Sequence, residues 1–198
     1  MVAVARARRR GRLHVEELAA QEGRSPEEVL GFLDAIRQHE LRGGVLLALL
    51  AERVDDDAMR RSLTRHAADE VRHAEWWGEI LARLGGRARP SPVGAAWQAL
   101  VRELVGGAAG GAALERFELS DLLRGTRDPL PPETVRAVLE AVNRIEHEAE
   151  ALFERLAHAF APDPAISRRL AQMRDDEVFH LAWVDQVLGR PSPAAPPT

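Results

Sequence analysis

The sequence predicts an all-α fold, an antiparallel four-helix bundle made of two helical hairpins with a long crossover connection. Three observations support this prediction. The 198 residues are rich in Ala, Leu, Arg and Glu and poor in runs of β-branched residues, a composition that favours helix. Start and stop signals mark four long helices. Within each pair the intervening turn is very short, which makes the paired helices antiparallel neighbours.

The first hairpin is expected over residues 26–85. Its opening SPEE at 25–28 combines an N-cap serine, a proline at the first helical position and the glutamate of a capping box. This helix should run to about Val54, and the acidic turn DDD at 55–57 should cap the second helix. The second helix should end near the glycine pair that begins at Gly85, because glycine favours the left-handed conformation of a helix end.

The second hairpin is expected over residues 132–189. Two prolines and a glutamate at 131–133 open its first helix, which should end before Pro162. An aspartate and a proline at 163–164 again place a capping residue before a proline and open the last helix. That helix should end at Gly189.

Three segments lie outside the predicted hairpins. Residues 86–131 form a long linker in which we expect short helices. Residues 1–24 form a basic arm with five arginines near its start, which we expect to be flexible and solvated rather than bound to nucleic acid or an anionic membrane. The proline-rich end at 190–198 should be an extended tail. The bundle domain, linker included, is therefore assigned to residues 25–189.

The composition excludes several classes of site. The chain has no cysteine, so disulfides, thiolate catalysis, iron–sulfur clusters and cysteine-based zinc sites are excluded, and any metal must bind histidine and carboxylate. It has no tyrosine, which excludes a tyrosyl radical. The net charge of −4 gives no reason to expect specific nucleic-acid binding. The lack of cysteine leaves the compartment open, and a cytoplasmic protein is the easiest fit. No apolar run approaches the roughly 18 residues of a membrane span.

A nearly repeated pentapeptide is the main functional signal in the sequence. The chain reads DEVRH at 69–73 and DEVFH at 176–180. Residues three apart share a helix face, so Glu70 and His73 should project together, as should the glutamate and histidine of the second copy. A single Glu-x-x-His is weak evidence for a metal site in a glutamate-rich helical protein. Two copies on corresponding helices of the two hairpins are much stronger evidence.

Each pentapeptide is preceded by a glutamate on the apolar face of the partner helix. Glu40 lies 30 residues before Glu70, and Glu146 lies 31 residues before Glu177. In an antiparallel hairpin these spacings place both glutamates at a similar height, and a buried carboxylate needs a partner or a metal. Glu150 is the alternative ligand in the third helix. The predicted metal ligands are Glu40, Glu70, His73, Glu146, Glu177 and His180.

This pattern resembles the ferritin-like superfamily of di-iron carboxylate proteins over both hairpins. The repeated Asp-Glu-x-x-His, each with a glutamate one helix upstream, resembles di-iron oxygenases, including arylamine N-oxygenases. Asp-Glu-x-Arg-His also looks like bacterial multicomponent monooxygenases. The resemblance implies two iron ions, with manganese or a mixed Mn/Fe pair as alternatives, bridged by Glu70 and either Glu146 or Glu177. It also implies that Asp69 and Asp176 accept hydrogen bonds from metal-bound histidines.

The resemblance implies an O2-activating oxidoreductase, an oxygenase or oxidase, that acts on a small organic substrate with electrons from an external donor or from the substrate itself. His66 and Trp77 could line its pocket. The same ligands suit a ferroxidase, an iron-handling protein or a peroxide-reducing protein of bacterioferritin or rubrerythrin type. A helical interaction protein without enzymatic activity is a further alternative. We also allow for a homodimer.

Overall fold

In the computed structural model, residues 13–89 and 128–190 are described, and every regular element among them is an α-helix. The all-α prediction is confirmed. The short helices expected in the linker fall on residues 90–127, outside the described part, as do residues 1–12 of the arm and the tail from residue 191. The long helices of the described part are α2 (Pro26–Ala51), α3 (Asp57–Leu84), α7 (Pro132–Ala159) and α8 (Pro164–Leu188).

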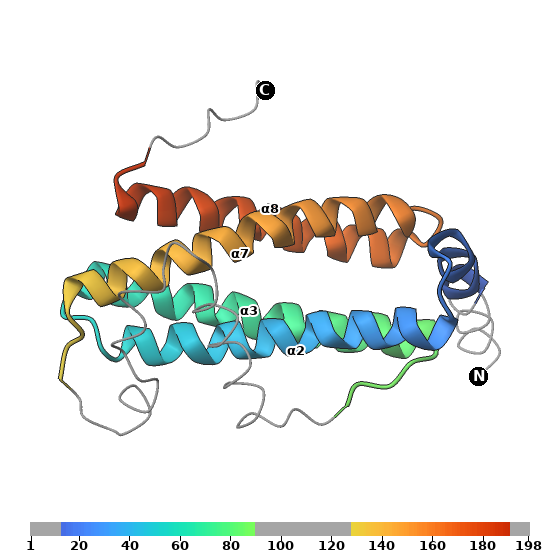
Figure 1. Ribbon diagram of the computed structural model, residues 1–198, viewed down its shortest axis with the longest axis horizontal. Helices are drawn as coiled ribbons and strands as arrows, with labels where there is room; N and C mark the ends of the chain where they lie inside the picture. The colour runs from blue at the N-terminus through green and yellow to red at the C-terminus, as the bar shows by residue number, and fades with distance from the viewer. Residues whose placement is uncertain (1–12, 90–127, 191–198) are drawn as a thin grey trace.

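Helices α2 and α3 form one antiparallel hairpin, and α7 and α8 form a second one that lies alongside it (Figure 1). Local caps set the helix starts. The Ser25 hydroxyl accepts a hydrogen bond from the Glu28 N–H at 3.2 Å, and Glu28 Oε2 accepts one from the Ser25 N–H at 2.7 Å. This is the predicted capping box. Asp56 caps α3 and Asp163 caps α8, which satisfies amide groups that would otherwise lack partners.

Two glycines end helices in the way that the sequence predicts. Gly85 follows α3 with φ +87° and Gly189 follows α8 with φ +70°, a backbone conformation that glycine adopts without a steric penalty. The observed helix bounds therefore agree with the expected ones to within a few residues. The agreement has a local cause, because caps and stops act within one helical turn.

The core consists of two apolar clusters with a polar layer between them. One cluster lies toward the α2–α3 turn and includes Leu47 and Leu63, and the other includes Leu33 and Trp77. Glu40 lies between these clusters along α2. Burying a large apolar side chain contributes about 1.5–3 kcal/mol, so the two clusters offset the cost of burying charged groups between them.

Part of the predicted arm packs into the core. Residues 13–22 form a helix whose Val15 and Ala19 are each 1% exposed and join the cluster around Trp77. These residues belong to the segment predicted to be flexible, and here the chain is helical instead. The reason is a short apolar stripe at i and i+4, a signal that the arginine-rich composition just before it obscures.

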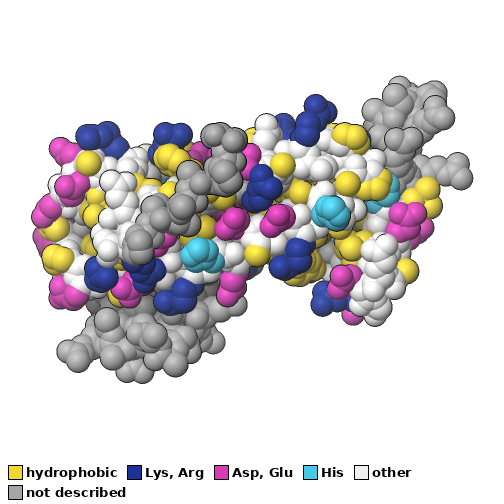
Figure 2. All heavy atoms as spheres, turned by 90° about the horizontal axis from the view of Figure 1, so that it is seen from above, with side chains coloured by type: hydrophobic (Ala, Val, Ile, Leu, Met, Phe, Trp, Pro, Cys, Tyr) yellow, Lys and Arg dark blue, Asp and Glu magenta, His cyan; other side chains and the backbone are white. Residues whose placement is uncertain are grey.

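The surface carries charges of both signs. Figure 2 shows acidic and basic side chains interspersed over one face, with apolar side chains between them. On this face the described residues therefore form no broad single-sign patch of the kind that nucleic acid requires. None of the helices in the described part of the chain is both long enough and apolar enough to cross a membrane.

Candidate metal centre

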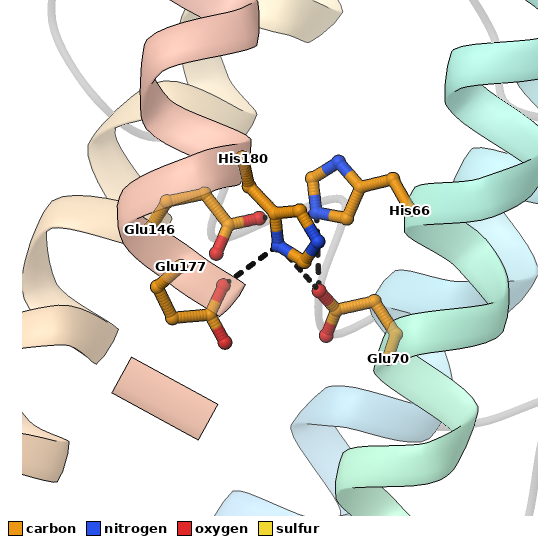
Figure 3. Close-up of side chains that lie close together, drawn as sticks. All are labelled: His66, Glu70, Glu146, Glu177 and His180. Atoms are coloured by element: carbon orange, nitrogen blue, oxygen red, sulfur yellow. Dashed lines mark hydrogen bonds and ion pairs between the residues drawn. The ribbon is translucent and has the colours of Figure 1, made fainter. Parts of the chain in front are cut away.

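A cluster of buried carboxylates and imidazoles occupies the polar layer between the two hairpins. Figure 3 shows one group of its members, which come from α3, α7 and α8 and converge on one region. Two overlapping groups each offer ligand atoms that lie within 4.8 Å of one another. The structure brings together all six predicted residues, and none is more than 6% exposed. One group is His66, Glu70, Glu146, Glu177 and His180, and the other is Glu40, Glu70, His73 and Glu177.

The histidines of the two pentapeptides point the same ring nitrogen into the cluster. His73 Nδ1 lies 3.1 Å from Glu177 Oε1 and 3.5 Å from Glu40 Oε2. His180 Nδ1 lies 2.9 Å from Glu177 Oε2 and 3.7 Å from Glu70 Oε1. The two halves of the site therefore have matching geometry, with each Nδ1 directed at the carboxylates where a metal ion would sit.

The other nitrogen of each imidazole contacts an aspartate of the opposite hairpin. His180 Nε2 lies 3.2 Å from Asp69 Oδ2, and His73 Nε2 lies 3.1 Å from Asp176 Oδ2. Arg72 joins the two aspartates, with Nη1 at 2.5 Å from Asp69 Oδ1 and Nη2 at 2.8 Å from Asp176 Oδ2. Each imidazole thus contacts the aspartate of the opposite hairpin. These reciprocal contacts hold each ring in one orientation and connect α3 to α8.

His66 belongs to the cluster as a third imidazole. Its Nε2 lies 3.1 Å from Glu70 Oε1 and 2.9 Å from Glu146 Oε1, and its ring stacks on His180 with centroids 3.6 Å apart. From the sequence, His66 is predicted as a possible pocket residue. Its position one turn before Glu70 on the same face was the signal for membership in the cluster. Trp77, the other predicted pocket residue, is fully buried with its ring centroid 5.9 Å from that of Phe153.

The third-helix glutamate of the cluster is Glu146. It is 5% exposed, whereas Glu150, the alternative, is half-buried and belongs to neither of the described ligand groups.

Two glycines of α2 lie beside the centre. A Cβ at Gly43 would be in ordinary van der Waals contact with Glu70, at 3.5 Å from its Oε2. A Cβ at Gly44 would lie 3.0 Å from the Ala67 carbonyl oxygen. Glycine at position 44 therefore lets α2 approach α3 closely at the height of the cluster.

The carboxylates of the cluster have strongly shifted pKa values. Burial, with the nearby charges of Glu40 and Glu146, raises the pKa of Glu70 to about 8. Burial and the charges of Glu146 and Glu70 raise the pKa of Glu177 well above its usual value. Burial also favours protonated Glu146, but the hydrogen bond and the charge of His66 outweigh it and lower this pKa to about 2. Burial among like charges therefore disfavours the ionised forms of Glu70 and Glu177, whereas His66 favours the ionised form of Glu146.

The pKa values of the two matching histidines are shifted in opposite directions. Burial lowers the pKa of His73, but its contacts with Asp176, Glu177 and Glu40 outweigh burial and raise the value to about 12. Burial and the charge of His66 instead lower the pKa of His180. The two halves therefore differ in their electrostatic surroundings, in part because the His66 ring stacks on His180.

The donor set fits a metal ion. Imidazole and carboxylate suit iron and manganese. His73 Nδ1 and Glu177 Oε1 are both buried, and neither has hydrogen-bond geometry to another described residue, although they lie 3.1 Å apart. A cation between such atoms would satisfy both of them. The cluster could therefore hold metal with the ligands that the sequence predicts.

Comparison with known proteins shows a similarity to an enzyme. The chain is 33% identical over 125 residues to 3-demethoxyubiquinol 3-hydroxylase of Albidiferax ferrireducens, which corresponds to 63% of this chain and 49% of the hydroxylase. The aligned part thus spans about half the length of that relative. No family model matches the chain, and no solved structure matches it.

Proposed function

We propose that the chain is a ferritin-like four-helix bundle that binds two iron ions and acts as an O2-activating oxygenase or oxidase on a small organic substrate. The observation that carries the proposal is the buried cluster, in which a glutamate from each of two helices and a Glu-x-x-His from each of two others converge. This is the ligand arrangement of dimetal carboxylate bundles. The similarity to a hydroxylase of an organic compound supports the reaction class.

Two metal positions account for the two overlapping ligand groups. Glu70 and Glu177 belong to both groups, so they are the candidates for bridging ligands. Glu40 and His73 would complete one position, and Glu146 with His180 would complete the other. The negative charge of four ionised glutamates matches two divalent cations. Manganese or a mixed Mn/Fe pair would suit the same ligands.

When bound, the metal pair would supply the redox and Lewis-acid chemistry needed to reduce O2. The protein's own residues orient and enclose that chemistry. Asp69 and Asp176 hold the two imidazoles by their Nε2 atoms, so the Nδ1 atoms remain directed inward. His66 holds the Glu70 and Glu146 carboxylates together. The apolar clusters on both sides limit access of water to the layer.

The reaction requires electrons from outside the site. Hydroxylation of a C–H bond by O2 consumes two electrons and two protons and releases one molecule of water together with the hydroxylated product. We therefore propose an external electron donor, or a substrate that supplies the electrons itself. The cytoplasmic location, a homodimeric state and the domain bounds stay predictions.

Anaerobic iron loading followed by metal analysis and exposure to O2 tests the proposal. We expect about two irons per chain and a coloured species after O2 addition, with its decay accelerated by an oxidisable substrate. Glu70→Ala and Glu177→Ala should abolish this binding, whereas Glu148→Ala, at an exposed position of α7, should bind as the wild type does. Stoichiometric iron in both cluster variants would refute the assignment.

The alternative of iron handling or peroxide removal rests on the same ligand set. It predicts continued iron uptake into a large particle, or rapid turnover of peroxide without an organic substrate. Size-exclusion chromatography of the iron-loaded protein and peroxide consumption assays separate it from the oxygenase proposal. A non-enzymatic helical protein would bind no iron, or would bind it without reacting with O2.

A further inference from the structure

A small pocket opens at one edge of the candidate centre, between α3 and α8. Its volume is about 80 Å³, and its walls include Ser62, His66, Phe179 and Trp183. Pockets for drug-sized organic ligands measure roughly 300–1,000 Å³, so this pocket is too small for such a molecule. It has room for a few molecules of the size of water.

The inner end of the pocket is polar. His66 is 2% exposed, and its Nδ1 has no hydrogen-bond partner among the described residues. Its Nε2 is already committed to Glu70 and Glu146, and Figure 3 shows the second ring nitrogen on the side away from the Glu70 carboxylate. His180 and Asp69 also line the pocket. The lining therefore combines the ring of a predicted ligand with a histidine whose Nδ1 has no partner among the described residues.

The outer end of the pocket is formed where the two pentapeptides differ. Phe179 is 53% exposed, and the Arg65 guanidinium lies 5.0 Å from its ring centroid. The corresponding residue of the first copy is Arg72, which closes its edge of the centre by ion pairs to Asp69 and Asp176. A phenyl ring cannot make those ion pairs. It rests beside the pocket and can move with a single side-chain rotation.

We propose that this pocket is the access route by which small polar molecules of up to about three heavy atoms reach the His180 side of the metal centre, with Phe179 as its gate. The inference rests on the proposed function, because it requires a metal at the cluster. The ligands that it admits are water, peroxide and small anions. An organic substrate too large for this pocket would have to reach the centre from another side.

Azide binding to the iron-loaded, oxidised protein tests the route, because azide is a three-atom anion that gives a visible absorption band on ferric iron. Ser62→Phe should fill the pocket and slow the appearance of the band at least about tenfold, and Phe179→Ala should speed it severalfold. The final absorbance should not change in either variant. Thr64→Phe and Val178→Ala, at exposed neighbouring positions, are the matched controls and should keep the wild-type rate.

The outcomes separate the route from the function on which it rests. If the wild type binds no iron, the proposed function fails and the inference fails with it. If iron binds stoichiometrically but azide gives no band, or binds at one rate in all variants, the function survives and the route is refuted. Circular dichroism reports whether Ser62→Phe folds. If it does not fold, the rate ratio between Phe179→Ala and Val178→Ala decides.

Discussion

The two hairpins supply the same ligand pattern but surround it differently. His66 lies on α3, one turn before Glu70, and its ring is hydrogen-bonded to two carboxylates. The corresponding residue of α8, four before Glu177, is the fully buried Met173. His73 is completely enclosed, whereas His180 stacks on His66 beside a pocket. A repeated sequence can therefore build two metal positions of unequal polarity and access.

Among the changes that compare the two hairpins, the largest expected effect comes from removing one histidine at a time. His73→Ala and His180→Ala each remove a ligand from only one of the two groups, so each variant should keep about one of the two irons. The remaining iron should differ in its spectrum between the two variants, because only the His180 side contains His66. Metal analysis and electron paramagnetic resonance measure this. Loss of both irons in either variant would show that the positions are not independent.

Asp176→Asn and Asp69→Asn change the partner of one imidazole each. We expect a loss of metal affinity of about 10–100-fold in each variant, since the partner of a ligating histidine fixes its orientation and basicity. Competition with a chelator measures the loss. Asp175→Asn, at an exposed neighbouring position, is the control. If Asp176→Asn weakened binding no more than Asp175→Asn, the reciprocal hydrogen bonds would have no part in holding metal.

His66→Met makes the α3 residue match Met173 of α8. The metal-free protein should lose about 1–3 kcal/mol of stability, because two buried carboxylates lose a hydrogen-bond partner. Thermal unfolding should shift down by about 2–4 °C per kcal/mol for a chain of this size. His39→Met, at a position beside Glu40 that is not in the cluster, is the control. An unchanged melting temperature in His66→Met would contradict the proposed pairing.

A further prediction concerns the pH dependence of the metal-free protein. The pKa of Glu70 rises from 4.5 to about 8 on folding and that of His66 from 6.5 to about 9. The folded state therefore binds more protons than the unfolded state between these values, and stability should fall as pH rises from about 5 to 9. The lowered pKa of Glu146 acts in the opposite sense below pH 4.5. Urea unfolding at several pH values measures this, and a stability that rises across that range would contradict it.

Much of the fold could be read from single residues. Ser25 with Glu28, Asp56 and the two helix-ending glycines act within one turn, so their effects follow from the chain alone. The ligand pairs at i and i+3 are equally local. The sequence does not predict the short helix at 13–22, because Val15 and Ala19 form only a very short apolar stripe. Such a stripe gains stability only by packing against another part of the chain.

The sequence by itself determined the helices, their caps and the chemical identity of the ligands, because these depend on residues a few positions apart along one helix. The tertiary structure decided how the helices face one another. Only the rotation and height of α3 against α8 pair each histidine with the aspartate of the opposite hairpin, and the same packing draws His66 between Glu70 and Glu146. These contacts join residues far apart in the chain, and no periodicity within one helix encodes them.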